Sequence, residues 1–128
     1  MKIEKGREIS AHEKVDRYRS IIYAGASGDF NPIHIDPEFA KKLGLGGSIL
    51  HGLCTLAFVA KSVTDCTGDP GSLRKLSCRF SAPVLSGDEI NISGSVAEVQ
   101  DSRGRIDLKV VNQNGLEVLQ KVVAEVDA

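Results

Sequence analysis

The order of local patterns along the chain predicts an α+β fold, in which one antiparallel sheet packs against a long helix. Helix signals fill the first half of the sequence, to about residue 67. After residue 72, apolar residues recur at every second position, the period of a half-buried strand. There is no internal repeat, low-complexity tract or linker, so we expect a single domain over residues 1–128. A chain of this length buries roughly two-thirds of its unfolded surface, enough for one core without disulfides or structural metals.

Two helices are expected before residue 45. A short strand is predicted within residues 1–10, followed by a helix over residues 11–26, because Ser10 and Glu13 have the S-x-x-E form of a capping box. A shorter helix is expected from Asp36, which is placed as N-cap with a proline at the first helical position. Gly44 is placed to end that helix in the left-handed conformation.

The third helix, predicted over residues 48–67, is apolar on nearly all sides. Such a helix is covered on most of its surface by other structure. Its longest nearly apolar run, residues 49–60, has 12 residues and is too short to span a bilayer. The Gly-Asp-Pro-Gly sequence at 68–71 ends the helix.

The second half of the chain predicts an antiparallel meander with one apolar face. Alternating segments occur around residues 75–80, 90–96, 106–110 and 116–126, and turn sequences separate them at 86–88, 102–104 and 114–115. Asn114-Gly115 is the strongest turn signal and predicts a type I′ hairpin. A curved sheet that wraps the long apolar helix buries both apolar surfaces, and this arrangement is the hot-dog fold.

Composition and cysteine spacing exclude several classes of protein. The 16 basic and 17 acidic residues give a formal net charge of −1, which does not favour nucleic acid as a partner. Three cysteines spaced 12 residues apart fit neither a zinc site nor a disulfide framework and indicate a reducing compartment. The N-terminus lacks the apolar segment of a secretory signal, so we expect a cytoplasmic protein that is not in the membrane.

The sharpest local feature is an acid and a histidine on either side of an Asn-Pro turn. Asp29 and His34 lie five residues apart, and Pro32 restricts Asn31 to extended geometry, which makes the turn stiff. A carboxylate and an imidazole that share one water can move protons near neutral pH. The alternative is ordinary turn chemistry, with the Asp29 carboxylate capping backbone amides and His34 merely packed.

Gly52 lies near the start of the long helix and suggests a second functional group. Backbone amides in the first helical turn have no intrahelical acceptor, and the missing side chain lets a ligand carbonyl approach. This is the arrangement of an oxyanion site, although close packing against the sheet explains Gly52 equally well. His51 beside it is more typical of a structural histidine. The spacing of Asp29, His34 and His51 matches no recognised metal site, so no metal is expected.

Together these segments resemble one enzyme family. The run from Ser27 to His34, followed 17 residues later by His51-Gly52, resembles the MaoC-like hydratases and dehydratases. More narrowly, it is similar to the single-domain (R)-specific enoyl-thioester hydratases and to the catalytic subunit of mycobacterial-type (3R)-hydroxyacyl-ACP dehydratases. The resemblance covers essentially the whole chain, and the Asp-Phe-Asn-Pro-Ile-His core is its specific part.

The resemblance implies roles for individual residues. Asp29 and His34 match the catalytic pair, and the Gly52 amide matches the group that binds the thioester oxygen, with Asn31 and His51 beside it in the substrate-binding group. Some members use a serine eight residues after the glycine, where this chain has Ala60; Ser62 is near in sequence but lies elsewhere around the helix.

The resemblance also implies the reaction and the partners. The expected activity is reversible hydration of trans-2-enoyl thioesters to (3R)-hydroxyacyl thioesters, without a cofactor. The substrate is an acyl-CoA or an acyl-ACP, and the chain is expected to form a homodimer or a higher hot-dog oligomer, or else a heterodimer. Candidate residues for lining the acyl tunnel are Phe30, Phe39, Leu56 and Phe58; candidates for meeting the carrier's phosphates are Lys41, Lys42, Arg74, Lys75 and Arg79.

Two other functions remain open at this point. A hot-dog thioesterase usually carries a carboxylate on the central helix, and residues 48–64 contain neither Asp nor Glu. A non-catalytic acyl-thioester-binding subunit, such as the stabilising partner in a heterodimer, has no use for the Asp29 and His34 pair. Both therefore rank below the hydratase.

Overall fold

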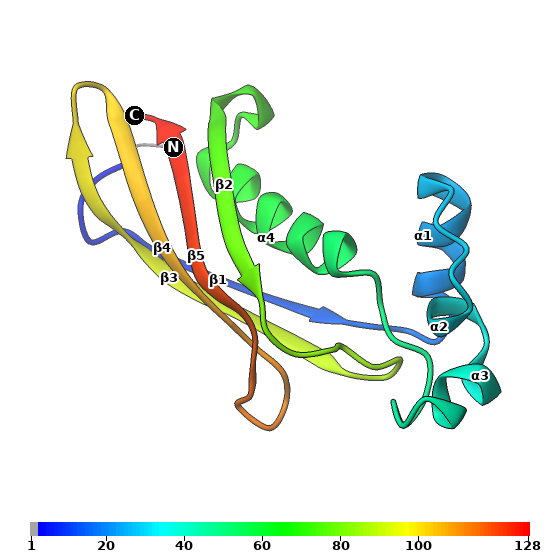
Figure 1. Cartoon of the computed structure of the whole chain (residues 1–128). Coiled ribbons are helices and arrows are strands. Elements are labelled where there is room, and N and C mark those ends of the chain that lie inside the picture. Colours follow the sequence, from blue (N-terminus) through cyan, green and yellow to red (C-terminus); the bar gives the residue numbers. More distant parts are fainter. Residues whose placement is uncertain (1–2) are drawn as a thin grey trace.

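A computed structural model describes residues 3–128 and has the predicted α+β architecture (Figure 1). Five antiparallel strands form one sheet in the order β1-β3-β4-β5-β2. The strands are β1 (Glu8–Lys14), β2 (Leu73–Phe80), β3 (Glu89–Gln100), β4 (Arg103–Val111) and β5 (Glu117–Asp127). The helices are α1 (Arg19–Ser27), α2 (Pro32–Ile35), α3 (Pro37–Lys42) and α4 (Gly52–Thr67), with a 3-10 turn at Pro70–Ser72.

The prediction of a helix over residues 11–26 is wrong at its N-terminal end. Strand β1 runs through this region and pairs with β3, from Glu8 opposite Ser95 to Lys14 opposite Glu89. Tertiary pairing therefore overrides the local capping signal. The predicted strand within residues 1–10 falls partly on residues 1–2, which lie outside the described part; β1 itself begins at Glu8. The α1 helix starts only after Asp16, whose side chain accepts a 2.8 Å hydrogen bond from the Tyr18 amide.

The two helix starts further along the chain differ in how well the sequence predicts them. Asp36 is the N-cap of α3, as predicted, and accepts hydrogen bonds from the amides of Glu38 and Phe39. Helix α4 begins at Gly52 and not at residue 48, because the Ile49 and Leu50 amides bond to the carbonyls of Ile33 and Val84. These two bonds hold the segment before α4 extended between α2 and the loop after β2.

Helix α4 is covered on most but not all of its surface. Its buried residues include Phe58, Val59 and Val63, which pack into the apolar clusters on the sheet. One stripe at four-residue spacing stays exposed, beginning with Leu53, whose exposed fraction is 62%. The prediction that the sheet covers most of the helix is therefore confirmed apart from this stripe, formed by Leu53, Ala57, Lys61 and Asp65.

The two-residue hairpin lies at a different turn from the predicted one. Asp101 and Ser102 have φ angles of 53° and 62°, the left-handed conformation that both central residues of a type I′ turn adopt. At the predicted turn only Gly115 has positive φ, so Asn114-Gly115 is not type I′. Instead the Asn112 side chain accepts hydrogen bonds from the Asn114 and Leu116 amides and closes a longer loop.

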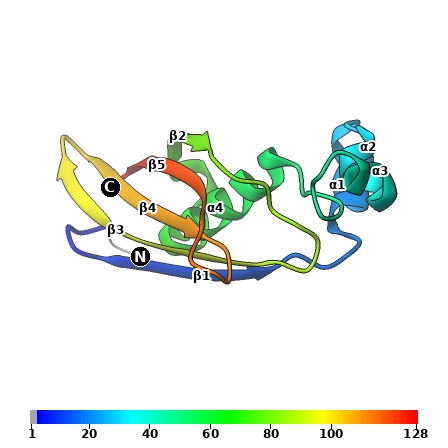
Figure 2. The same ribbon diagram turned by 60° about the horizontal axis from the view of Figure 1, so that its bottom comes forward.

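The three short helices form a separate layer at one end of the molecule. Figures 1 and 2 show α1, α2 and α3 together beyond the N-terminal end of α4, while the C-terminus lies at the opposite end of the sheet. No helix within residues 3–128 has the length and apolar character needed to cross a membrane.

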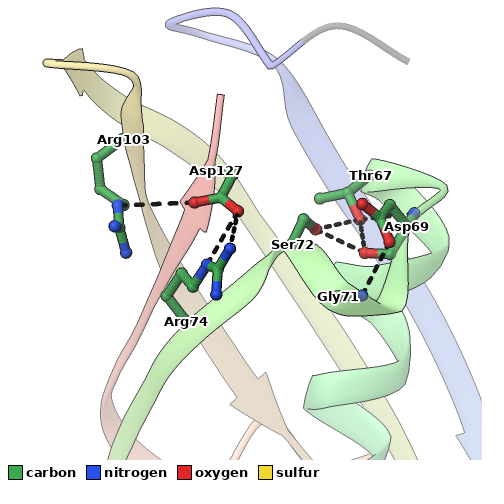
Figure 3. Close-up of polar contacts among 7 residues, drawn as sticks. All are labelled: Thr67, Asp69, Gly71, Ser72, Arg74, Arg103 and Asp127. Atoms are coloured by element: carbon green, nitrogen blue, oxygen red, sulfur yellow. Dashed lines mark hydrogen bonds and ion pairs between the residues drawn. The ribbon is translucent and has the colours of Figure 1, made fainter.

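Hydrogen bonds and ion pairs fasten the opposite end of α4 and the sheet (Figure 3). The buried hydroxyls of Thr67 and Ser72 lie 2.8 Å apart and both bond to the Asp69 carbonyl. On the neighbouring strands, Arg74 bonds to the Asp127 carboxylate, and Arg103 lies 3.9 Å from it; Arg74 accounts for most of the lowering of the Asp127 pKa. This end of the molecule is therefore built for stability and lies far from the Asn-Pro turn.

Candidate active site

The Asn-Pro turn brings Asp29 and His34 together. Asn31 caps helix α2, because its side chain accepts a 3.2 Å hydrogen bond from the Ile33 amide. The Asn31 amide in turn donates to Oδ1 of Asp29. With the turn fixed in this way, Nε2 of His34 lies 3.7 Å from Oδ2 of Asp29. Asp29 thus caps a backbone amide through one oxygen and faces the imidazole with the other.

The backbone determines which nitrogen of His34 is available for chemistry. Nδ1 lies 2.8 Å from the Ile49 carbonyl oxygen, and because a carbonyl can only accept, Nδ1 carries the hydrogen. In the neutral ring Nε2 is then unprotonated and faces Asp29. The His34 side chain is only 10% exposed, whereas that of Asp29 is 54% exposed. The pair therefore stands at the boundary between solvent and the interior.

His51 contacts both members of this pair, through the Asp29 backbone and the His34 ring. Its Nε2 donates a 2.9 Å hydrogen bond to the backbone carbonyl of Asp29. Its ring lies between two others, with centroids 3.8 Å from His34 and 4.8 Å from Tyr23 and planes within 20° of parallel. No local pattern predicts this three-ring stack, since its residues come from α1, α2 and the N-cap of α4.

The same three side chains do not form a good metal site. Potential ligand atoms of Asp29, His34 and His51 lie within 4.8 Å of one another. However, the rings of His34 and His51 are stacked, so their in-plane lone pairs run side by side and do not converge on one point. One nitrogen of each ring already donates to a carbonyl.

A cavity of about 520 Å³ adjoins His34 and the start of α4. Gly52 is the first residue of α4 and lines this cavity, and its amide has no acceptor within residues 3–128. Gly52 also packs closely, because a Cβ at this position would lie 2.8 Å from Cε1 of Phe80. This contact supports the packing explanation of Gly52, and the oxyanion explanation stays a prediction. The rest of the lining is mostly apolar: Ile49, Leu50, Leu53, Thr55, Phe80, Ser81, Ala82, Pro83, Val84, Val118 and Leu119.

Several residues expected near the substrate lie elsewhere. None of the four tunnel candidates lines the 520 Å³ cavity; Phe58 belongs to the core, and Phe30 is exposed on the helical layer. Ser62 donates to the Val59 carbonyl at 2.7 Å, so it does not replace the family serine missing at Ala60. Among the basic candidates, Lys41 lines a second cavity of about 420 Å³, together with Arg17, on the other side of His34.

Comparison with known proteins accounts for this arrangement. The family model described as "MaoC like domain" matches residues 1–117. The chain belongs to the MaoC-like family. Structural comparison gives this MaoC-like domain a TM-score of 0.90 to R-hydratase PhaJ1 from Pseudomonas aeruginosa, at 27% identity, covering 98% of this chain and 82% of that one. The hot-dog fold predicted from the strand pattern is thereby confirmed.

Curated relatives of the MaoC-like domain are longer proteins. Peroxisomal enoyl-CoA hydratase 2 from Arabidopsis thaliana is 42% identical over 80 residues, which are 61% of this chain and 26% of that protein. The peroxisomal hydratase-dehydrogenase-epimerase of Saccharomyces cerevisiae is 42% identical over 97 residues, 73% of this chain and 10% of that protein. The chain therefore spans about a quarter or less of the length of these two relatives.

Proposed function

We propose that this MaoC-like domain catalyses the reversible hydration of trans-2-enoyl thioesters to (3R)-hydroxyacyl thioesters. The observation that carries the proposal is the 3.7 Å pair of Asp29 and His34 beside an apolar cavity that the Gly52 amide also lines. Relatives named enoyl-CoA hydratase and R-hydratase support the same reaction.

Each group has a distinct task in this mechanism. The Gly52 amide, at the positive end of α4, polarises the thioester carbonyl and stabilises the enolate charge that develops during addition. The Asp29 carboxylate and Nε2 of His34 hold one water next to C3, the β-carbon of the enoyl thioester. The water oxygen bonds to C3, the pair removes one proton from it, and one proton is delivered to C2 on the same face. Because the two groups are coupled, the proton belongs to the pair.

The cavities suggest how the substrate lies. The apolar 520 Å³ cavity takes the acyl chain, and the second cavity, with Arg17 and Lys41, is suited to the anionic carrier, CoA or ACP. Arg74 is not suited to this task, because it is paired with Asp127 at the far end of the sheet.

The proposal includes three statements about the whole chain. Residues 1–128 form one domain. A homodimer, or a heterodimer, covers the exposed side chains of Leu53 and Phe80 beside the cavity, since large apolar groups at a site mouth favour association. The compartment is the cytoplasm, which agrees with three unpaired cysteines, although the two longer relatives carry peroxisomal names.

The alternative functions have less support. A thioesterase needs a nucleophile or a carboxylate aimed at the carbonyl, but Asp65 on α4 is exposed and bonds to Lys61. Cys54 is close in sequence to Gly52, but burial raises the pKa of its thiol and disfavours the nucleophilic thiolate. A simple binding subunit does not explain why Asp29 and His34 face each other.

The test is turnover of crotonyl-CoA by the purified chain and by two variants, Asp29→Asn and His34→Ala. Each variant should lose about a hundredfold or more in kcat, the usual contribution of a positioned acid or base. Asp65→Asn and His12→Ala change the same residue types at exposed positions and should keep wild-type turnover.

Product analysis separates the candidate functions. The hydratase yields the (3R)-hydroxyacyl thioester with the thioester bond intact. Release of free thiol would instead show a thioesterase, and tight binding of enoyl-CoA without turnover would show a binding subunit. Wild-type turnover in both site variants would refute the assignment of the pair.

A further inference from the structure

Two buried polar atoms next to the site lack a hydrogen-bond partner among residues 3–128. They are Nδ1 of His51 and the hydroxyl oxygen of Thr55. His51 is 4% exposed and Thr55 is 1% exposed, so both atoms are shielded from bulk solvent. A buried polar group left without a partner costs about 1–3 kcal/mol, and such groups are rare in native proteins.

Thr55 differs in this respect from the other hydroxyl residues of α4. The hydroxyls of Ser62, Thr64 and Thr67 each donate to the carbonyl three residues earlier, at 2.7, 3.3 and 3.2 Å. This is the ordinary local bond of serine and threonine in a helix. The equivalent bond of Thr55, from its hydroxyl to the Gly52 carbonyl, is absent among residues 3–128. The Thr55 hydroxyl is therefore left free to bond to a different group.

The two unpartnered atoms are chemically complementary. Nε2 of His51 donates to the Asp29 carbonyl, so in the neutral ring Nδ1 carries a lone pair and needs a donor. The Thr55 hydroxyl is a donor. His51 is the N-cap of α4, and Thr55 lies in the first turn of that helix. The threonine side chain has three staggered positions, so rotation about one bond changes which group the hydroxyl faces.

We propose that Thr55 is a positioning residue of the active site, whose hydroxyl donates to Nδ1 of His51. This bond fixes the His51 tautomer that holds the Asp29 carbonyl and so maintains the distance between Asp29 and His34.

The inference deepens the proposed function, and its kinetic part rests on it. Thr55→Val keeps the shape of the side chain but removes the hydroxyl, and it should lower kcat by roughly threefold to tenfold, the effect of one hydrogen bond. KM should change little, because Thr55 lines the 520 Å³ cavity and valine keeps almost the same shape there. Thr55→Ser should restore kcat, and Thr64→Val, the same change at the other end of α4, should have no effect.

Nitrogen NMR of the histidine rings gives a readout that does not depend on activity. The chain has three histidines, and His12→Ala assigns the exposed one, which leaves His34 and His51. In the wild type, Nδ1 of His51 should be unprotonated and hydrogen-bonded, and Thr55→Val should shift it toward the free value. A wild-type Nδ1 that is protonated or not hydrogen-bonded overturns the proposal even if Thr55→Val does not fold.

The other possible results also confirm or overturn the proposed role of Thr55. A loss of kcat in Thr55→Val without a change at His51 overturns the proposal, and so does a change at His51 with full activity. If the wild type does not hydrate crotonyl-CoA, the proposed function fails, while the NMR result still decides whether Thr55 bonds to His51.

Discussion

Gly52 combines two requirements at a single residue. Its amide has no acceptor among residues 3–128, the residue lines the 520 Å³ cavity, and its missing side chain leaves room for the Phe80 ring. Gly52→Ala keeps the amide but adds a methyl group, which would meet Cε1 of Phe80 at 2.8 Å. The added methyl also blocks the approach of the thioester carbonyl to the amide, so the oxyanion donor is lost in effect. We therefore expect kcat/KM for crotonyl-CoA to fall by about a hundredfold, the usual effect of losing one such donor.

A double-variant cycle with Phe80→Ala separates the two requirements. In the Phe80→Ala background, the added methyl should no longer lower the midpoint of thermal unfolding, because the clashing ring is gone. The loss of kcat/KM should persist in that background. Recovery of activity there would contradict an oxyanion role and leave Gly52 as a packing residue only.

At the scale of single residues, sequence could predict the groups in the site but not what orients them. Asp29, His34 and Gly52 come with local signals: a proline-stiffened turn and a glycine at a helix start. The groups that fix the imidazoles are the backbone carbonyls of Ile49 and Asp29. Any residue supplies a carbonyl, so no residue type in the sequence marks these contacts; only the folded chain does.

At the scale of the elements, close strand pairing depends on glycine at one position in β3. A Cβ on Gly94 would lie 2.2 Å from the Asp107 carbonyl oxygen and 3.0 Å from Cα of Leu108, both backbone atoms of β4 that cannot rotate away. Gly94→Ala should therefore lower the free energy of unfolding by about 3 kcal/mol or more, as severe overpacking does. Urea denaturation followed by circular dichroism measures this.

Gly25 in α1 offers the matched control. A Cβ there meets no heavy atom within 4 Å, and the backbone does not have positive φ. Gly25→Ala should raise the free energy of unfolding by about 0.5–1 kcal/mol, since alanine is the better helix former. Equal destabilisation by both changes would show that the β3–β4 contact is not the cause.

The errors in the predicted elements share a physical origin. Residues 11–14 carry a plausible helix start but become a strand, because pairing with β3 satisfies their backbone groups. Asn114-Gly115 is a strong local turn signal, yet the two-residue turn forms at Asp101-Ser102, where the strand register places it. The signals that held, such as Asp36 at the start of α3, are those whose hydrogen bonds are entirely local.

At the scale of the whole molecule, the proposed catalytic pair lies in the less deeply packed part. The apolar clusters draw mainly on α4 and the sheet. From α1, Tyr23 packs against them and the Arg19 guanidinium lies 5.1 Å from the centroid of the Phe58 ring. Many side chains of this layer are exposed, including Ile22 at 64% and Leu43 at 59%. A layer with few buried apolar contacts opens locally at a lower free energy than the core. We expect such opening to give the proposed thioester substrate a way into the site.

Hydrogen exchange should reveal this hierarchy. In the wild type, amides of α1 and α3 should exchange faster than those of β3 and β4, which pair on both sides in the sheet.

His51→Ala removes the bond to the Asp29 carbonyl and the ring between Tyr23 and His34. It should therefore lower protection in the layer by about tenfold, the effect of slightly more than one hydrogen bond, and leave β3 and β4 unchanged. His12→Ala, at an exposed position on β1, should change neither. A uniform loss of protection across layer and sheet in His51→Ala would instead mean that the layer and the sheet unfold as one unit, with His51 stabilising the whole domain.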